Sequence, residues 1–382
     1  MLRVLGQGLE FIAFVVLARR LGAADFGRLS VAFLIGRYGA LIADFGASVQ
    51  GPRDVAAMRD PASLHALARR RLIVALALSI GAGCAAAIVG ELALGLMIVA
   101  MILAGGLNRD WLALGRLDGT RSAMPVAIRG VALAAGAIAV HTVGQASLLI
   151  GVGYLASGAA SALINRLEPI ARDIVGRVPV RAWMLLGVVM AQVYTSLDTV
   201  LLGTLRSVRE AGIYAGVYRL PLAWITVSGL VIAAAVPVAT EALTRDRSRL
   251  PQLRRAAIRV GGGLGALLLI SAPIAALLVV PVFGEEYSDG RWPLALLMVA
   301  TAVATVTAPI GALYLGVGVD RTYAQILTVG AVLNLAANVV LIPRHGMMAA
   351  AATTVASETL VLVLMLRALL AVENRGPEGT GR

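Results

Sequence analysis

The chain has 382 residues, of which 59% are hydrophobic and only 14% are charged. A soluble domain carries about 25% charged residues, so the composition excludes an ordinary water-soluble domain. All of the 33 cationic side chains are arginines, and the net charge is +12. Because these arginines lie mainly between apolar segments, the charge does not indicate a nucleic-acid-binding domain with one basic face.

Apolar segments recur along the whole chain at the length of a helix that crosses about 30 Å of hydrocarbon. They predict an all-α integral membrane protein with about twelve transmembrane helices. The first segment ends in two arginines rather than in a small-residue cleavage site, so we expect it to be a retained helix. The predicted spans are 4–21, 27–49, 72–91, 93–107, 123–141, 147–165, 182–204, 212–238, 260–282, 293–317, 323–342 and 347–370.

The arginines are distributed unequally between the two sides of these spans. Most fall in segments that share a side with both termini, and cytoplasmic segments are enriched in Arg and Lys. We therefore expect a multi-pass protein of the bacterial cytoplasmic membrane with both termini in the cytoplasm. The arginines expected outside are Arg19, Arg20, Arg28, Arg206, Arg209, Arg291 and Arg344.

The chain divides into two halves after the sixth predicted span. We expect residues 1–165 to form an N-terminal six-helix bundle, 166–181 a cytoplasmic linker, 182–372 a C-terminal six-helix bundle and 373–382 a cytoplasmic tail. Weak similarity between the starts of the two halves predicts a parallel pseudo-repeat. Transporters with such repeats bind their substrate between the two bundles.

Five short motifs follow one another along the predicted spans. They are Leu17–Gly22 with Asp25-Phe26-Gly27; Asp44-Phe45-Gly46 with Arg53-Asp54; Ser196–Gly203 with Ala211–Leu220 and Pro237; Phe283–Tyr287; and Asn334–Asn338 with Ile342, Pro343 and Gly346. In these motifs the chain resembles, over essentially its whole length, the polysaccharide-transport branch of the MOP exporter superfamily, the Wzx-type oligosaccharide flippases. The lipid II flippases of that superfamily have more helices and fit the chain less well.

The resemblance implies a two-bundle carrier that moves an undecaprenyl-diphosphate-linked oligosaccharide to the outer leaflet for O-antigen and lipopolysaccharide biosynthesis. It implies no enzyme activity and no cofactor. Expected partners are the lipid-linked oligosaccharide, membrane lipids, a polysaccharide polymerase and a chain-length regulator. Two alternatives remain: a multidrug or metabolite exporter of the same superfamily, and a membrane glycosyltransferase or polymerase of the same pathway, which would need a longer polar loop.

Phosphate recognition inside a membrane requires cations, and arginine binds phosphate bidentately while staying charged. Arg37 lies mid-span in the second predicted helix with Tyr38 beside it, and we expect it to contact the diphosphate. The alternative is an ion pair of Arg37 with Asp44 or Glu10 that only holds the bundle together. The other substrate-binding candidates are Tyr218, Arg219, Asn334 and Asn338.

Coupling to an ion gradient requires a carboxylate that gains and loses a cation within the membrane. Asp198 in the seventh span and Glu358 in the last span are the main candidates, and Glu10 and Asp44 are next. The alternative is that the first two carboxylates are satisfied by hydrogen bonds or by a neighbouring arginine. The hydrogen-bond donors considered are Thr195 and Thr354.

Several of these polar residues have simpler explanations. Arg219 could extend to the membrane surface, and the asparagines at 334 and 338 could hydrogen-bond between helices. Arg129, at the start of the fifth span, is expected to set topology. No His/Glu pair has metal-ligand spacing and no glycine-rich phosphate loop with lysine occurs, so neither a metal nor a nucleotide is expected.

Overall fold

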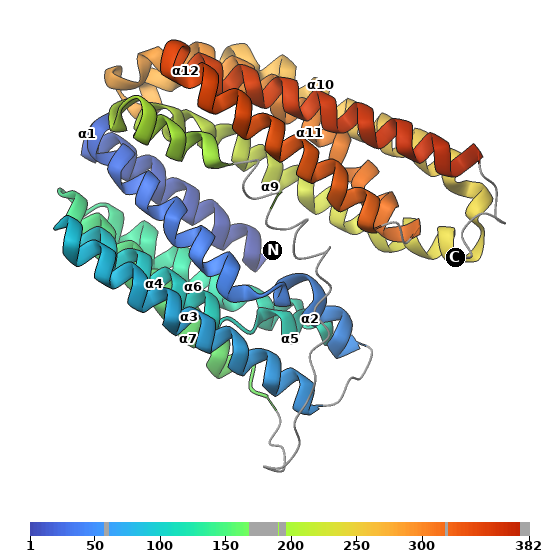
Figure 1. Ribbon diagram of the computed structural model, residues 1–382, viewed down its shortest axis with the longest axis horizontal. Helices are drawn as coiled ribbons and strands as arrows, with labels where there is room; N and C mark the ends of the chain where they lie inside the picture. The colour runs from blue at the N-terminus through green and yellow to red at the C-terminus, as the bar shows by residue number, and fades with distance from the viewer. Residues whose placement is uncertain (57–60, 168–189, 191–195, 318–319, 375–382) are drawn as a thin grey trace. The chain divides into compact units, whose positions relative to one another are not determined.

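The computed structural model describes residues 1–56, 61–167, 190, 196–317 and 320–374, and every regular element in these ranges is a helix. The chain forms two compact units, Met1–Leu185 (unit 1) and Leu186–Arg382 (unit 2) (Figure 1). The predicted linker and tail lie largely outside the described residues, at 168–181 and 375–382.

Unit 1 is built around the first helix. Helix α1 packs against α3, α4, α6 and α7, and α4 in turn packs against α3 and α7 (Figure 1). Two short helices that the sequence analysis did not predict, α2 and α5, pack against each other. The helices are α1 (Leu2–Asp44), α2 (Ala47–Ala56), α3 (Pro61–Val89), α4 (Leu92–Leu107), α5 (Asp110–Gly115), α6 (Gly119–Ala137) and α7 (Val143–Ile164).

Unit 2 is built around α11, which packs against α9, α10 and α12. Its apolar core includes Ile310, Leu327 and Met365, and the buried Tyr314 hydroxyl donates to the Met365 carbonyl at 2.5 Å. The elements are Ser196–Leu205, α9 (Val208–Arg245), η1 (Arg247–Arg249), α10 (Leu250–Phe283), η2 (Glu285–Gly290), α11 (Arg291–Val317) and α12 (Asp320–Asn374).

Helices α1 and α12 each cover two predicted spans. Helix α1 bends at Gly22, where φ is 74° and ψ is 171°, and α12 bends at Gly346, where φ is 55° and ψ is −137°. Glycine adopts positive φ without the steric cost of a Cβ atom. The two predicted turns are therefore sharp bends within long helical elements and not extended loops.

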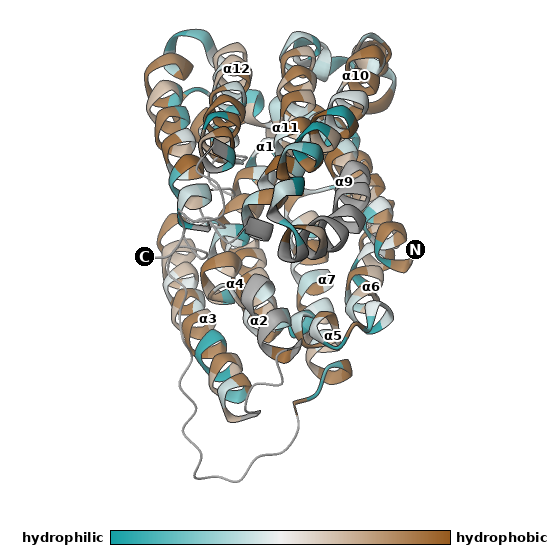
Figure 2. Ribbon diagram, turned by 90° about the vertical axis from the view of Figure 1, so that its right-hand side faces the viewer, coloured by the Kyte–Doolittle hydropathy of each residue, from teal (hydrophilic) through white to brown (hydrophobic). Residues whose placement is uncertain are grey.

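Six helical segments of the described residues are long and apolar enough to cross a membrane. Large apolar side chains also face outward, for example Ile270 at 74% and Leu277 at 72% exposure on α10, and Figure 2 shows that hydrophobic residues make up much of the helical ribbons. Such surfaces suit lipid rather than water. The six segments are Ala62–Val89, Leu92–Gly115, Val143–Ile164, Leu250–Phe283, Glu285–Tyr314 and Arg321–Ala371.

Candidate functional site

Two glycines bring α1 and α6 into close contact in unit 1. A Cβ atom added at Gly130 would lie 2.1 Å from the carbonyl oxygen of Gly6, and one added at Gly6 would lie 2.7 Å from the α6 backbone. Only small residues permit this approach between helices. Because Arg129 precedes Gly130 and Glu10 lies one turn after Gly6, the contact places two charged side chains next to each other.

The carboxylate of Glu10 binds both Arg129 and Tyr154. Arg129 donates to Oε2 of Glu10 from Nη2 at 2.8 Å and from Nε at 3.2 Å, and the Tyr154 hydroxyl donates to Oε1 at 2.8 Å. The Arg129 guanidinium carbon lies 4.4 Å from the centre of the Tyr154 ring, within the range of a cation–π interaction. We call these three residues, from α1, α6 and α7, the Glu10 cluster.

Arg129 was expected only to set topology, and that expectation is incomplete. Its side chain is 19% exposed and is held by Glu10. Arg37 is exposed and close enough to Tyr154 for an electrostatic interaction, and Tyr38 beside it is half-buried. The structure therefore brings Glu10, Arg37 and Arg129 into one region of unit 1.

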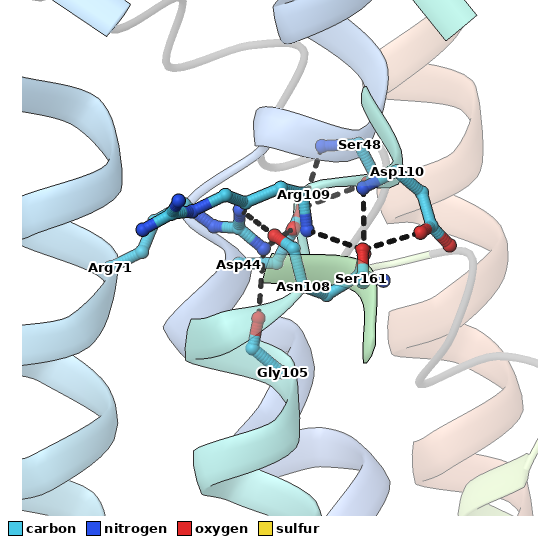
Figure 3. A network of polar contacts seen from close by, with 8 residues as sticks. All are labelled: Asp44, Ser48, Arg71, Gly105, Asn108, Arg109, Asp110 and Ser161. Atoms are coloured by element: carbon cyan, nitrogen blue, oxygen red, sulfur yellow. Dashed lines mark hydrogen bonds and ion pairs between the residues drawn. The ribbon is translucent and has the colours of Figure 1, made fainter. Parts of the chain in front are cut away.

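Arg71 is enclosed at the junction of α1, α3 and α4, with 1% of the residue exposed. Its Nη2 donates to Oδ1 of Asp44 at 2.7 Å and to the Gly105 carbonyl at 2.8 Å, and its Nη1 donates to the Asn108 carbonyl (Figure 3). One guanidinium thus neutralises a carboxylate and donates hydrogen bonds to two backbone carbonyls.

Asp44 has no bond to Arg37. Its second oxygen, Oδ2, accepts from the Ser48 backbone N–H at 2.9 Å and from the Ser48 hydroxyl at 2.8 Å. A seven-residue spacing places Arg37 and Asp44 on one helix face but about 10 Å apart along the axis, whereas Arg71 approaches from another helix. The suggested Arg37–Asp44 pair is therefore wrong.

The carbonyls that Arg71 binds lie at a break between α4 and α5. Helix α4 stops before Asn108, whose ψ of 128° is extended. On the other side of the break, the Ser161 hydroxyl of α7 accepts from the Arg109 N–H at 2.9 Å and contacts Oδ1 of Asp110 at 2.6 Å (Figure 3). Side chains of α3 and α7 thus pair the backbone groups that the break releases, as a membrane interior requires.

Asp198 is the best-enclosed predicted carboxylate, with 3% exposure. Its Oδ2 accepts from the Tyr214 hydroxyl, and its Oδ1 accepts from the Thr199 N–H at 2.8 Å. Thr354, one of the two donors considered from sequence, donates its hydroxyl to the Ala350 carbonyl at 2.9 Å instead; Thr195 lies outside the described residues. All of these donors are neutral.

Glu358 lies in the same region of unit 2 and is 8% exposed. Tyr218, itself 9% exposed, is close enough to interact electrostatically with both Asp198 and Glu358. The structure therefore gathers the two main ion-coupling candidates around one tyrosine. We call Asp198, Tyr214, Tyr218, Thr354 and Glu358 the Asp198 cluster.

Asn334 and Asn338 form a chain of hydrogen bonds between the two halves of α12. Asn338 Nδ2 donates to Oδ1 of Asn334 at 2.9 Å, and Asn334 Nδ2 donates to the Ser357 hydroxyl at 3.1 Å. The Thr353 hydroxyl donates to Oδ1 of Asn338. The interhelical explanation is therefore confirmed, and binding of sugar by these amides stays a prediction.

The remaining candidates are spread more widely. Arg219 is half-buried and interacts electrostatically with Tyr287. Within the described ranges, no group of three or more His, Cys, Asp or Glu residues could hold a metal ion.

Sequence reasoning missed three residues that bind the predicted carboxylates: Arg71, Tyr154 and Tyr214. Arg71 is the last of three consecutive arginines that the sequence presents as equivalent loop cations, and Arg70 beside it is exposed. Of these three residues, only Tyr214 lies in one of the five sequence motifs, Ala211–Leu220, and no role was assigned to it there. Tertiary packing alone selects which arginine is enclosed.

No protein-family model matches the sequence, and no curated protein sequence matches it. Several solved structures do match the chain. An inward-facing multidrug resistance MATE family transporter of the MOP superfamily matches with a TM-score of 0.70 and 13% identity over 98% of this chain and 96% of that chain. Lipid II flippase MurJ, in an inward closed conformation, matches with a TM-score of 0.72 and 11% identity over 97% of this chain and 86% of that chain.

An outward-facing MATE family transporter also matches, with a TM-score of 0.61 and 12% identity over 98% of this chain and 94% of that chain. At these identities the likeness concerns the fold. The neighbours are membrane transporters and a flippase and not enzymes. The chain is thus a multi-pass membrane protein with the fold shared by MATE transporters and MurJ.

Proposed function

We propose that the chain is a Wzx-type flippase that moves an undecaprenyl-diphosphate-linked oligosaccharide across the bacterial cytoplasmic membrane by ion-coupled alternating access. In this proposal 1–165 and 182–372 form two six-helix bundles with about twelve spans in all, and both termini are cytoplasmic. A polysaccharide polymerase and a chain-length regulator would act on the lipid after its transfer. The shared fold supports a carrier, and the charges of unit 1 support this choice of substrate.

The observation that carries the proposal is the Glu10 cluster with Arg37 nearby. An organic cation would be recognised by a carboxylate beside aromatic rings, and unit 1 has such a site at Glu10 and Tyr154. The guanidinium of Arg129 already fills it. The exposed Arg37 adds a second cation to the same region, which suits an anionic headgroup better than a cationic drug.

Unit 2 supports the coupling part of the proposal. Neutral donors leave Asp198 with its full negative charge, and burial of such a charge favours uptake of a proton or a metal cation. Glu358, in the same cluster, is the second group that could carry it. One charge moved across 100 mV releases about 2.3 kcal/mol, so transfer of one or two cations is a sufficient driving force.

The test is transport by the purified chain in proteoliposomes with a polyprenyl-diphosphate-linked oligosaccharide, with an organic cation as the competing substrate. We expect gradient-dependent flipping of the lipid and no cation transport. Arg37→Lys should lose most flipping, because an ammonium group lacks the planar fork. Asp198→Asn or Glu358→Gln should bind lipid normally but lose gradient dependence. Transport of the organic cation alone would establish the second candidate, a multidrug exporter like the MATE neighbours.

A further inference from the structure

The guanidinium of Arg129 is bound by a carboxylate oxygen, and phosphate oxygens are acceptors of the same kind. Both of its bonds, from Nη2 and Nε, go to one oxygen of Glu10. This edge of an arginine pairs equally with carboxylate and phosphate oxygens. Tyr154 donates its hydroxyl to the other carboxylate oxygen, and a hydroxyl can donate to a phosphate oxygen in the same way.

The pair is also partly exposed. The side chains of Arg129 and Glu10 are 19% and 15% exposed. Both hydrogen bonds of the Arg129 guanidinium go to Oε2 of Glu10, and neither goes to a backbone carbonyl. Replacing the carboxylate by another anion would therefore leave no backbone group of unit 1 without its hydrogen bond.

Arg71 in the same unit shows the opposite arrangement. Its side chain is 1% exposed, and it binds two backbone carbonyls in addition to Asp44. Displacing Asp44 would leave the Arg71 guanidinium bound to the Gly105 and Asn108 carbonyls. Arg71 is thus fixed by the backbone around it, whereas Arg129 is held mainly by one exchangeable side chain.

We propose that Arg129 and Tyr154 form a diphosphate-binding subsite that Glu10 occupies when no ligand is bound. An incoming diphosphate takes the place of the Glu10 carboxylate, so that ligand entry and release of Glu10 are one exchange. Other charged residues lie close enough to interact electrostatically with this subsite: Arg37 with Tyr154, and Asp110 with Arg129. Arg3 interacts in the same way with Asp110. The inference rests on the proposed function only for the source of the diphosphate.

Glu10→Gln tests the exchange because it removes the competing charge and keeps the side-chain shape. The full-length chain, in nanodiscs of zwitterionic lipid, is titrated with inorganic pyrophosphate and, separately, with a polyprenyl diphosphate. We expect Glu10→Gln to bind the diphosphate about tenfold more tightly than the unmodified chain. Arg129→Gln should bind at least about tenfold more weakly.

Glu91→Gln is the matched control. It removes a carboxylate that is also paired with an arginine, Arg28, but that is 44% exposed and outside the Glu10 cluster. Its diphosphate affinity should equal that of the unmodified chain. An equal gain in Glu91→Gln and Glu10→Gln would overturn the proposal, because the effect would then be one of net charge.

Unchanged or weaker binding by a folded Glu10→Gln variant would also overturn it. If that variant does not fold, the double variant Glu10→Gln/Arg129→Gln keeps the net charge and should lose diphosphate binding; retained binding contradicts the subsite. The two ligands separate the sources. Pyrophosphate binding that responds to Glu10→Gln, without polyprenyl diphosphate binding, supports the subsite and contradicts the lipid flippase.

Discussion

In unit 1 the carboxylates of Glu10 and Asp44 each face a guanidinium, from Arg129 and Arg71 respectively. In unit 2, Asp198 instead receives hydrogen bonds from the Tyr214 hydroxyl and from the Thr199 backbone N–H. Both arrangements supply hydrogen bonds to enclosed oxygens. They differ in the net charge that they leave inside the protein.

This difference has a mechanistic consequence. An ion pair has no net charge, so its disruption leaves two charges that need new partners. A carboxylate bound only by neutral donors keeps one negative charge, which a proton or a metal cation can neutralise. Within the proposed function, unit 1 is therefore the place for exchange of anions and unit 2 is the place for uptake of cations.

The largest expected effect comes from breaking an ion pair in unit 1. Arg71→Gln leaves Asp44 and the carbonyls of Gly105 and Asn108 without their donor. We expect a loss of about 3–5 kcal/mol in the free energy of unfolding, because removal of one partner exposes the other charge to a poorly solvating interior. Arg70→Gln, at the exposed neighbouring position, is the control for thermal and denaturant unfolding in detergent. A loss as small as that of the control would show that unit 1 does not depend on its ion pairs.

Breaking the neutral hydrogen-bond network around Asn338 in unit 2 should lower the free energy of unfolding by a smaller amount. Asn338→Ala removes the hydrogen bonds with Asn334 and Thr353, and interhelical hydrogen bonds in membranes contribute about 0.6 kcal/mol on average and up to about 1.7 kcal/mol. We expect a loss in the free energy of unfolding of about 1 kcal/mol. Thr359→Ala on the exposed face of α12 should change it little. A loss equal to that of Arg71→Gln would remove the energetic contrast between the units.

The smallest effect is expected at an exposed ion pair. Arg28 contacts Glu91 and Asp25, but the three side chains are 42%, 44% and 47% exposed. Exposed pairs of this kind contribute about 0–1 kcal/mol. Arg28→Gln should therefore lower the free energy of unfolding by less than about 0.5 kcal/mol, and even less at high salt. A larger, salt-independent loss would show that enclosure does not account for the strength of the Arg71 pair.

The sequence predicted the helical class well because that prediction depends on local composition. Apolar segments of spanning length predict helices wherever they occur, and most described helices begin and end near the predicted spans. The differences arise at glycines, at short helices, and at the starts of α3 and α10, which begin at Pro61 and Leu250, before the predicted spans at 72 and 260. Whether Gly22 and Gly346 sit in loops or in bends depends on the packing around them, and α2 and α5 are too short to give an apolar signal.

Candidate site residues were predicted less completely. Charges inside apolar segments, such as Glu10, Arg37 and Asp198, are conspicuous, so the sequence identified them. It could not assign their partners, because Arg71 and Arg129 come from helices distant in the chain. Asp44 is an example. Its position on the helix face suggested Arg37 as its ion-pair partner, but the close packing of α1, α3 and α4 places Arg71 against it.

The sequence by itself determined that this protein is a helical membrane protein with a few charges inside apolar segments, because hydropathy and charge are local properties. Only the tertiary structure decided which of those charges neutralise one another. That choice depends on the distances between helices, and glycine contacts such as Gly6 with Gly130 permit a close approach. The division into a charge-paired unit 1 and an Asp198 cluster with neutral donors in unit 2 is therefore a property of packing.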